Sequence, residues 1–444
     1  MDPVKRFLKE TATYTIFDFL RRFIGFLLIP IYTRALTPEQ YGILFIVNLV
    51  LGFLMIFYNL GLGASLYKYQ PKDQNAFVSG IFFMIPYTAI LSLILIYFSQ
   101  DFARFFLHKQ SLSHLFQIGF IFLFFEGILN QVLALTNIER HPSRFGFLSL
   151  LRFTSGLLLN ILFVVYLKRG VAGVLSGNCI AAIGVGLVAL GIARSHFTFK
   201  FDASLLKEQF RYAIPLLPAI TGFFLIDYID RFMLERMAGF TTVGVYSLGY
   251  QFGTVVNLAV LGYRSAYAPF FFHLKEEEHS EMGRAFRYFM LGIGFVYVLL
   301  IMLLPDAFRL FVGRRFWTAQ HLVWILALGF VAHGIYINFA SHLYIKNRTH
   351  IVSILVTICL GVNILGNSLL IPPLKGYGAA WATLFAYAIL VILTYLVTRP
   401  EDYDPIVFLK VFFYILAVTL INLLHPSLII RLVLIFGYGI LLII

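Results

Sequence analysis

The sequence predicts an all-α polytopic membrane protein with about fourteen transmembrane helices. The chain has 444 residues, of which 60% are hydrophobic and only 12% charged, whereas a soluble domain usually carries about 25% charged residues. Apolar blocks such as 76–98 and 351–371 also run without a formal charge. A helix needs about 20 such residues to cross the hydrocarbon core of a bilayer.

The expected spans alternate with short polar connections, and the longest connection lies around 273–284. The spans are placed at 12–35, 41–66, 76–98, 114–136, 145–166, 171–193, 210–234, 241–268, 284–304, 319–344, 350–371, 377–397, 405–424 and 427–444. With the N-terminus inside, more Lys and Arg fall on the cytoplasmic side than outside. The positive-inside rule then predicts that both termini are cytoplasmic.

Composition excludes several classes of protein. The net charge of +13 comes from basic residues in loops between spans, which predicts contact with anionic lipid head groups and no binding of nucleic acid. Cys179 and Cys359 fall in the middle of expected spans, so neither a disulfide nor a metal site is expected. No nucleotide-binding glycine loop, metal-spaced His/Cys set or catalytic triad is apparent, so we expect a protein that is not an enzyme and needs no cofactor.

A weak internal repeat divides the chain. Shifting by 207 residues overlays 125–168 on 332–375 without gaps, so that Asn160 meets Asn367 and Lys168 meets Lys375. Thr33-Arg34 in the first half parallels Asp230-Arg231 in the second. We expect two parallel repeats of six spans, 1–200 and 201–400, followed by two additional transmembrane helices, 401–444.

Charged residues inside the first span are the strongest sign of a polar cavity. Asp18, Arg21 and Arg22 lie within the expected span, where a charge is costly unless it faces a cavity or a partner. Asp18 reaches both arginines at helical spacing but neutralises only one of them. Local pairing and snorkelling are the alternatives to a cavity-lining role.

Polar stripes in three other spans give further candidates. Asn48 and Asn59 share a face of the second span, for which simple helix packing is an equal alternative. Tyr250, Asn257 and Arg264 share a face of the eighth span, together with Tyr246 and Gly253, and we expect this face to line the cavity. The alternative is that this face only packs against a neighbouring helix.

The seventh span combines prolines with charges. Pro215 and Pro218 predict a bend, either as a fixed kink or as a hinge. Asp227 and Arg231 are expected to pair at i,i+4, which leaves Asp230 as the freer carboxylate and a candidate for ion coupling.

Two other groups of polar residues are expected to be structural. Glu126 and Arg152 fall at similar depth in neighbouring spans, which predicts an interhelical ion pair. His333 and His342 are expected to be core histidines rather than proton carriers.

Three motifs carry a resemblance to a known family. They are residues 22–30 (RFIGFLLIP) with 32–42 (YTRALTPEQYG), residues 230–234 (DRFML) with 243–248 (VGVYSL), and residues 376–383 (GYGAAWAT). These motifs resemble those of Wzx-like oligosaccharide flippases, the polysaccharide transporter family of the multidrug/oligosaccharidyl-lipid/polysaccharide exporter superfamily. The resemblance implies two six-helix bundles in a V shape, with spans 1, 2, 7 and 8 around a central cavity.

The same resemblance implies a flippase that moves polyprenyl-pyrophosphate-linked oligosaccharides across the cytoplasmic membrane by alternating access, coupled to H⁺ or Na⁺ if an ion takes part. A lipid II flippase and a cation-coupled drug exporter of the same fold are alternatives, and a membrane-embedded glycan polymerase or ligase is a third. Partners would be the lipid-linked glycan, membrane lipids, a polysaccharide polymerase or glycosyltransferases. The candidate substrate-binding residues are Arg21, Arg22, Arg34, Asn48, Asn59, Arg231, Tyr250, Asn257 and Arg264, and the candidate ion-coupling residues are Asp18, Asp227 and Asp230.

Overall fold

The computed structural model describes residues 26–198, 200–273, 279–346, 348–400, 403, 405–424 and 427–443, and these residues form helices and no β-strand. Eleven described helices are long and apolar enough to cross a membrane. One of them, Ala203–Arg264, contains most of the seventh and eighth predicted spans. Two shorter apolar helices, Phe26–Ala35 and Ile429–Gly439, lie in the first and last predicted spans. The predicted all-α membrane fold is therefore confirmed.

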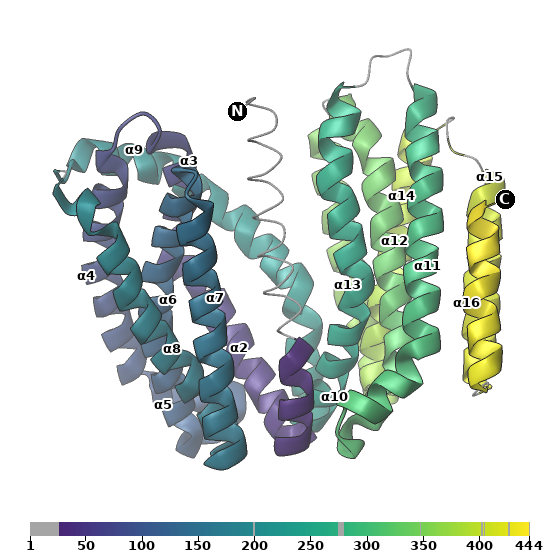
Figure 1. The fold of residues 1–444 in the computed structure, drawn as a ribbon, viewed down its shortest axis with the longest axis horizontal. Helices are drawn as coiled ribbons and strands as arrows, with labels where there is room; N and C mark the ends of the chain where they lie inside the picture. The colour runs from purple at the N-terminus through teal and green to yellow at the C-terminus, as the bar shows by residue number, and fades with distance from the viewer. Residues whose placement is uncertain are drawn as a thin grey trace. The chain divides into compact units, whose positions relative to one another are not determined.

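The chain divides into two compact units, Met1–Tyr228 (unit 1) and Ile229–Ile444 (unit 2). The helices of unit 1 (Figure 1) are α2 Pro38–Asn59, α3 Leu62–Tyr69, α4 Asn75–Tyr97, α5 Ser99–Leu107, α6 Ser113–Ile138, α7 Pro142–Asn160, α8 Gly170–Ile192 and α9 Ala203–Ala213. The α10 helix, Leu217–His273, passes from unit 1 to unit 2. Unit 2 continues with α11 His279–Phe311, α12 Gln320–Ile345, α13 Thr349–Leu374, α14 Gly376–Thr398, α15 Pro405–Leu423 and α16 Leu428–Ile443. The predicted domain bounds at 200 and 400 stay a prediction.

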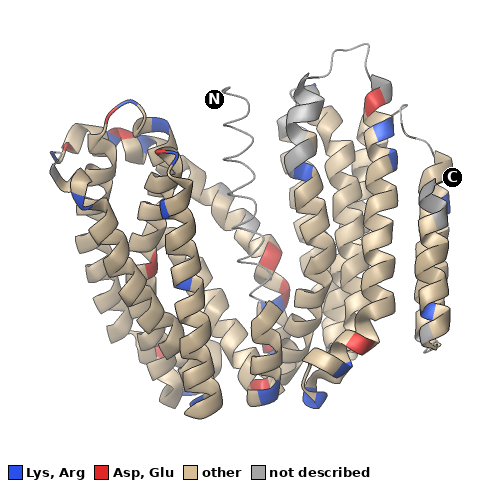
Figure 2. Cartoon of the chain, in the orientation of Figure 1, with Lys and Arg blue, Asp and Glu red and all other residues tan. Residues whose placement is uncertain are grey.

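Charge is scarce along the described helices and gathers mainly toward their ends (Figure 2). Large apolar side chains are instead exposed along the helices, such as Leu93, Leu365 and Phe413, each at least 60% exposed. In water these surfaces would drive aggregation, whereas a lipid bilayer solvates them.

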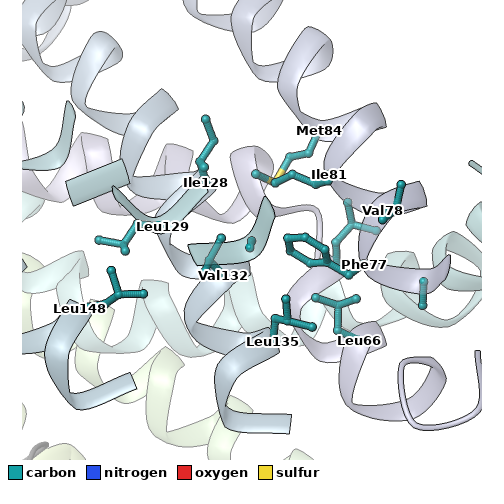
Figure 3. Packing of buried hydrophobic residues seen from close by; sticks show 14 of the residues in the cluster. Leu66, Phe77, Val78, Ile81, Met84, Ile128, Leu129, Val132, Leu135 and Leu148 are labelled. Carbon is teal, nitrogen blue, oxygen red and sulfur yellow. The ribbon is translucent and has the colours of Figure 1, made fainter. Parts of the chain in front are cut away.

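The core of unit 1 lies between α4, α6 and α7. Phe77 and Met84 of α4 pack with Ile128 and Val132 of α6 and with Leu148 of α7, all at most 2% exposed (Figure 3). Because lipid tails are as apolar as these side chains, close packing rather than transfer from water stabilises such a cluster.

The seventh and eighth predicted spans form one long element with two breaks. Pro215 lies in a 3₁₀ turn, Ile214–Leu216, that separates α9 from α10, so the predicted proline bend is confirmed. Gly239 interrupts α10 with a φ of 78° and a ψ of 171°, a conformation available to glycine. Before the first break, the Ser204 hydroxyl and the backbone N–H groups of Leu205 and Ser204 donate hydrogen bonds that lower the pKa of Asp202, the N-cap of α9.

The predicted repeat is confirmed in its register. The bounds of α6 shifted by 207 residues are those of α12, and the start of α7 shifts onto the start of α13. Lys168 and Lys375 occupy equivalent turns and have positive φ angles of 50° and 51°. Asn160 and Asn367 are both fully buried, at 1% and 0% exposure.

The last two helices pack against α11. Arg431 of α16 donates through Nη1 to the Asp306 carboxylate at 2.6 Å and to the Met302 carbonyl at 3.0 Å. Tyr297 and Thr419 share a buried hydrogen bond of 2.8 Å between α11 and α15. Polar contacts therefore attach both added helices to the body of unit 2.

Candidate functional site

The polar groups inside the helices of each unit are the candidate functional groups. Asp18, Arg21 and Arg22, the candidates of the first span, lie outside the described residues. Of the remaining candidates, Arg34 lines one of two pockets described in unit 1, and Asp230, Arg231 and Tyr250 belong to one network in unit 2.

The first pocket, here called the Glu126 pocket, has a volume of about 420 Å³ and lies between α6, α7 and α8. Arg152 donates through Nε to the Glu126 carboxylate at 2.8 Å, and both side chains are about one-fifth exposed. The predicted interhelical ion pair is confirmed. The pair borders an open space lined by polar and apolar side chains rather than a sealed core.

Three asparagines that the sequence analysis did not name as site residues also line this pocket. Asn130, Asn160 and Asn178 line it together with Ser149, and Asn160 donates to the Asn178 amide oxygen at 3.1 Å. Gly156 makes room for the guanidinium, since a Cβ there would lie 3.1 Å from Nη1 of Arg152. Such a lining of amides and one ion pair can hold water or the hydroxyl groups of a polar ligand.

The ion pair gives a direct prediction. Glu126→Gln and Arg152→Gln are each expected to lower the yield of folded protein, because each leaves an opposite charge without its partner. The double variant should recover part of the loss, since it leaves no charge behind. Detergent-extracted, monodisperse protein would be measured by size-exclusion chromatography, and strictly additive losses would contradict the coupling.

The second pocket, here called the Arg34 pocket, has a volume of about 550 Å³. Its charged lining residues are Arg34 and Lys168, and its polar lining is completed by Gln40 and by the glycine that starts α8, Gly170. Among the described residues, its lining includes no carboxylate. The predicted candidate Arg34 therefore borders a cationic pocket within unit 1.

The other unit 1 candidates lie apart from each other. Asn48 is exposed, while Asn59 is half-buried and faces α6, with its Oδ1 4.0 Å from where a Cβ of Gly127 would be. Gly52, between them in α2, lies under the ring of Phe224. This part of the predicted stripe is a packing surface.

In unit 2, Asp230 and Arg231 form a buried ion pair. Arg231 Nη1 lies 3.1 Å from Asp230 Oδ1, and both residues are at most 4% exposed. Tyr246 donates to Asp230 Oδ2 at 2.5 Å, and the Arg231 guanidinium lies 4.0 Å from the centre of the Tyr250 ring. The expectation that Asp230 is the freer carboxylate is wrong, because both of its oxygens are engaged. The predicted Asp227–Arg231 pair stays a prediction.

Much of the predicted cavity face of the eighth span packs against α12. The Tyr250 ring contacts Phe330 at a centroid distance of 5.3 Å, and a Cβ on Gly253 would lie 3.2 Å from Leu326. The expectation of an open face is wrong for Gly253, which is buried against α12, whereas the cavity-lining role of the half-buried Tyr250 stays a prediction. Asn257 is half-buried, and Arg264 is exposed.

His333 and His342 lie inside α12. The His333 ring packs on Tyr387 at 5.2 Å, and the His342 ring meets Tyr403 edge-on at 5.5 Å. Both histidines are therefore placed among aromatic side chains, as expected for core positions. Arg264 lies close enough to His333 to act on it electrostatically.

The fold of this chain is similar to that of solved membrane transporters. The structure of the lipid II flippase MurJ in an inward closed conformation has the same fold, with a TM-score of 0.71 and 16% identity over 96% of this chain and 97% of that chain. An inward-facing multidrug resistance MATE family transporter of the MOP superfamily matches with a TM-score of 0.64 and 14% identity over 85% of this chain and 94% of that chain. The fold of this chain is thus shared with these two transporters.

The sequence itself matches the family of polysaccharide biosynthesis proteins over residues 7–275, and the chain belongs to that family. A curated relative is Lsg locus putative protein 1 of Haemophilus influenzae (strain ATCC 51907 / DSM 11121 / KW20 / Rd), 22% identical over 74% of this chain and 79% of the relative. An uncharacterized membrane protein of the same organism is 20% identical over 78% of this chain and 86% of its own length. The predicted family resemblance is confirmed.

Proposed function

We propose that this protein is a flippase that moves polyprenyl-pyrophosphate-linked oligosaccharides across the cytoplasmic membrane. The observation that carries the proposal is a combination: the chain belongs to the polysaccharide biosynthesis proteins, and its fold is shared with a structure named as a lipid II flippase. Neither half of this observation would define the substrate class by itself.

The chemistry of such a substrate fits the polar groups of the chain. A lipid-linked oligosaccharide carries an anionic diphosphate, a hydroxyl-rich glycan and an apolar tail. The intramembrane arginines suit the diphosphate, because guanidinium groups bind phosphate oxygens through paired hydrogen bonds. The amides of the Glu126 pocket suit hydroxyl groups, and the exposed apolar faces leave a tail in contact with lipid.

A cation-coupled drug exporter is the second candidate, supported by the MATE fold. Such an exporter needs an intramembrane carboxylate that can bind the cation, and the described carboxylates support this less well than the arginines support a flippase. Asp230 is paired with Arg231 and accepts a hydrogen bond from the Tyr246 hydroxyl, so a cation would have to displace both. Asp18 and Asp227 stay candidates for coupling to H⁺ or Na⁺.

Deletion of the gene in its own organism tests the proposal. We expect loss of surface glycan together with accumulation of the polyprenyl-pyrophosphate-linked oligosaccharide in membrane extracts, measured by mass spectrometry and reversed by the wild-type gene. An exporter would instead change drug susceptibility and leave the glycan intact. If the gene encoded a polymerase or ligase, the deletion strain would still translocate single repeat units. Labelling of intact cells would detect these units on the outer face of the membrane.

The topology implied by the proposal has its own test. Both termini should be cytoplasmic, as should the connection around 275–281, whereas the turn near Arg314 should be outside. Alkaline phosphatase and green fluorescent protein fusions at these positions would measure it. An external signal at 275–281 or a cytoplasmic signal at Arg314 would contradict the span assignment.

A further inference from the structure

We propose that the Glu126 pocket binds a neutral sugar ring through its adjacent hydroxyl groups. The described lining of the pocket lies within unit 1 and encloses about 420 Å³, inside the range of roughly 300–1,000 Å³ that is usual for small-ligand sites. The inference deepens the proposed transport function and rests on it for the source of the sugar. The binding itself can be measured without transport.

The ion pair leaves hydrogen-bonding groups for a ligand. Arg152 reaches the Glu126 carboxylate through Nε alone, at 2.8 Å from Oε2. Within the described part of the chain, the two Nη groups of Arg152 and Oε1 of Glu126 have no hydrogen-bond partner. Donors and an acceptor therefore lie next to each other in the pocket wall. A hydroxyl group both donates and accepts, so two adjacent hydroxyls of a sugar can use both members of the pair.

The charge of the lining favours a neutral ligand. Its described charged side chains are one guanidinium and one carboxylate, so an anion would meet Glu126 and a cation would meet Arg152. Asn130, Ser149 and Asn178 add neutral hydrogen-bonding groups around the pair. Leucine and phenylalanine side chains supply the apolar part of the wall, against which the C–H face of a sugar ring can pack.

The equivalent place in unit 2 shows that such a bundle packs without a polar pocket. The gapless shift of 207 residues pairs four lining residues with residues that form no ion pair of this kind. The pairs are Glu126 with His333, Asn130 with Ile337, Ser149 with Val356, and Arg152 with Cys359. Ile337, Val356 and Cys359 belong to an apolar cluster of unit 2. The polar lining of unit 1 is therefore no requirement of the fold, and inside a membrane such groups are costly unless they face a cavity or a partner.

A single glycine keeps the unit 1 pocket open. A Cβ on Gly156 would lie 3.1 Å from Nη1 of Arg152 and 3.5 Å from the Asn178 amide oxygen. Unit 2 has Asn363 at the equivalent position, and its amide oxygen accepts a hydrogen bond from Asn367 at 2.9 Å. In unit 2 an amide side chain therefore stands where a glycine leaves room for a ligand in unit 1.

The repeat supplies the test variants. Asn130→Ile and Ser149→Val each place the unit 2 side chain in the unit 1 pocket and retain both members of the ion pair. Each removes a neutral hydrogen-bonding group, so we expect each to weaken sugar binding by about fivefold. Thr154→Val is the matched control, because Thr154 lies on the same helix, is exposed and is not a lining residue.

The experiment uses the full chain in nanodiscs of phosphatidylcholine, with folding checked by size-exclusion chromatography. One probe is the oligosaccharide that mild acid releases from the polyprenyl-pyrophosphate-linked glycan of the same organism, and the other is maltotriose. Each probe would be titrated by saturation-transfer difference NMR, which detects weak ligands. We expect saturable binding of the released oligosaccharide that Asn130→Ile and Ser149→Val weaken and Thr154→Val leaves unchanged. The two pocket variants are assayed separately, so a folding defect in one leaves the other as the test.

The two probes distinguish the sources of the sugar. Variant-sensitive binding of the released oligosaccharide supports a subsite for the transported glycan, and variant-sensitive binding of maltotriose alone supports a sugar site unrelated to that glycan. Binding of neither probe, or binding that both pocket variants leave unchanged, would overturn the inference. That result would leave the deletion phenotype intact, and an absent deletion phenotype would leave maltotriose binding intact, so the two proposals fail separately.

Discussion

Replacing Arg231 with alanine is expected to remove most of the folded protein from the membrane fraction. The guanidinium pairs with Asp230 and stacks on Tyr250 in a site where both charged residues are at most 4% exposed. Removal of the guanidinium leaves a buried carboxylate that keeps hydrogen bonds from the Tyr246 hydroxyl and from the backbone N–H of residue 231, and neither donor carries a counter-charge. Breaking such a pair costs about 3–5 kcal/mol, a large share of the stability of a typical domain.

The yield of monodisperse protein and its midpoint of thermal unfolding would measure this effect. The double variant Asp230→Asn with Arg231→Gln should recover part of the loss. Arg284→Ala is the matched control, because Arg284 pairs with Glu281 at an exposed i,i+3 position, where its side chain is 65% exposed. Its expected change is within about 0.5 kcal/mol. Equal behaviour of Arg231→Ala and Arg284→Ala would contradict the assigned role of the buried network.

Replacing both Arg21 and Arg22 with alanine is expected to abolish glycan export while membrane insertion stays normal. With a rise of about 1.5 Å per residue, these positions lie roughly 12–15 Å along a span that begins near residue 12. Two positive charges at that depth are energetically unfavourable in the membrane, and Asp18 can neutralise only one of them. A cavity that holds a diphosphate would provide a counter-charge for the second arginine.

Conservative replacement separates charge from geometry. Arg→Lys at both positions should restore export in part, since lysine keeps the charge but lacks the paired donors of a guanidinium. Complementation of the deletion strain would measure export, with protein level followed by immunoblot. Arg144→Ala, at an exposed position in the first turn of α7, should export normally. Full complementation by the well-expressed double-alanine variant would remove these arginines from the substrate site.

Long apolar blocks made the fold predictable from the sequence, whereas short helices and breaks within helices were not predicted. The blocks at 76–98, 114–136 and 171–193 correspond to α4, α6 and α8. The nine-residue helix α5 was missed, because such a helix lies far below the spanning length that the blocks reveal. The second span was predicted as one helix, but Leu60 and Gly61 break it with positive φ angles of 45° and 70°. In the sequence, only the glycine at position 61 hints at this break. A Cβ at Gly61 would lie 3.1 Å from the Ala213 carbonyl oxygen.

Contacts in the candidate site could be predicted where both residues lie at a similar depth in neighbouring spans. They could not be predicted where tertiary packing decides which residues meet. Glu126 and Arg152 could be paired because both lie at similar depth in adjacent spans. Asp230 and Arg231 could not, since successive residues on a regular helix do not face one another. The pocket also contains asparagines from three helices, Asn130, Asn160 and Asn178. Their spacing in the sequence does not indicate that the three side chains lie close together. The gapless repeat, in contrast, did identify the buried Asn160 and Asn367.

Translocation by the purified full chain tests the central claim most directly. The chain would be reconstituted into liposomes containing the polyprenyl-pyrophosphate-linked oligosaccharide of its own organism, with and without an imposed H⁺ or Na⁺ gradient. A membrane-impermeant glycosidase added outside would report the fraction of glycan that reaches the outer leaflet over time. The account predicts digestion beyond the outer-leaflet fraction seen in protein-free liposomes, and normal folding without such digestion in the Arg21/Arg22 double-alanine variant. Digestion confined to the protein-free level, by correctly folded wild-type protein under either gradient, would contradict it.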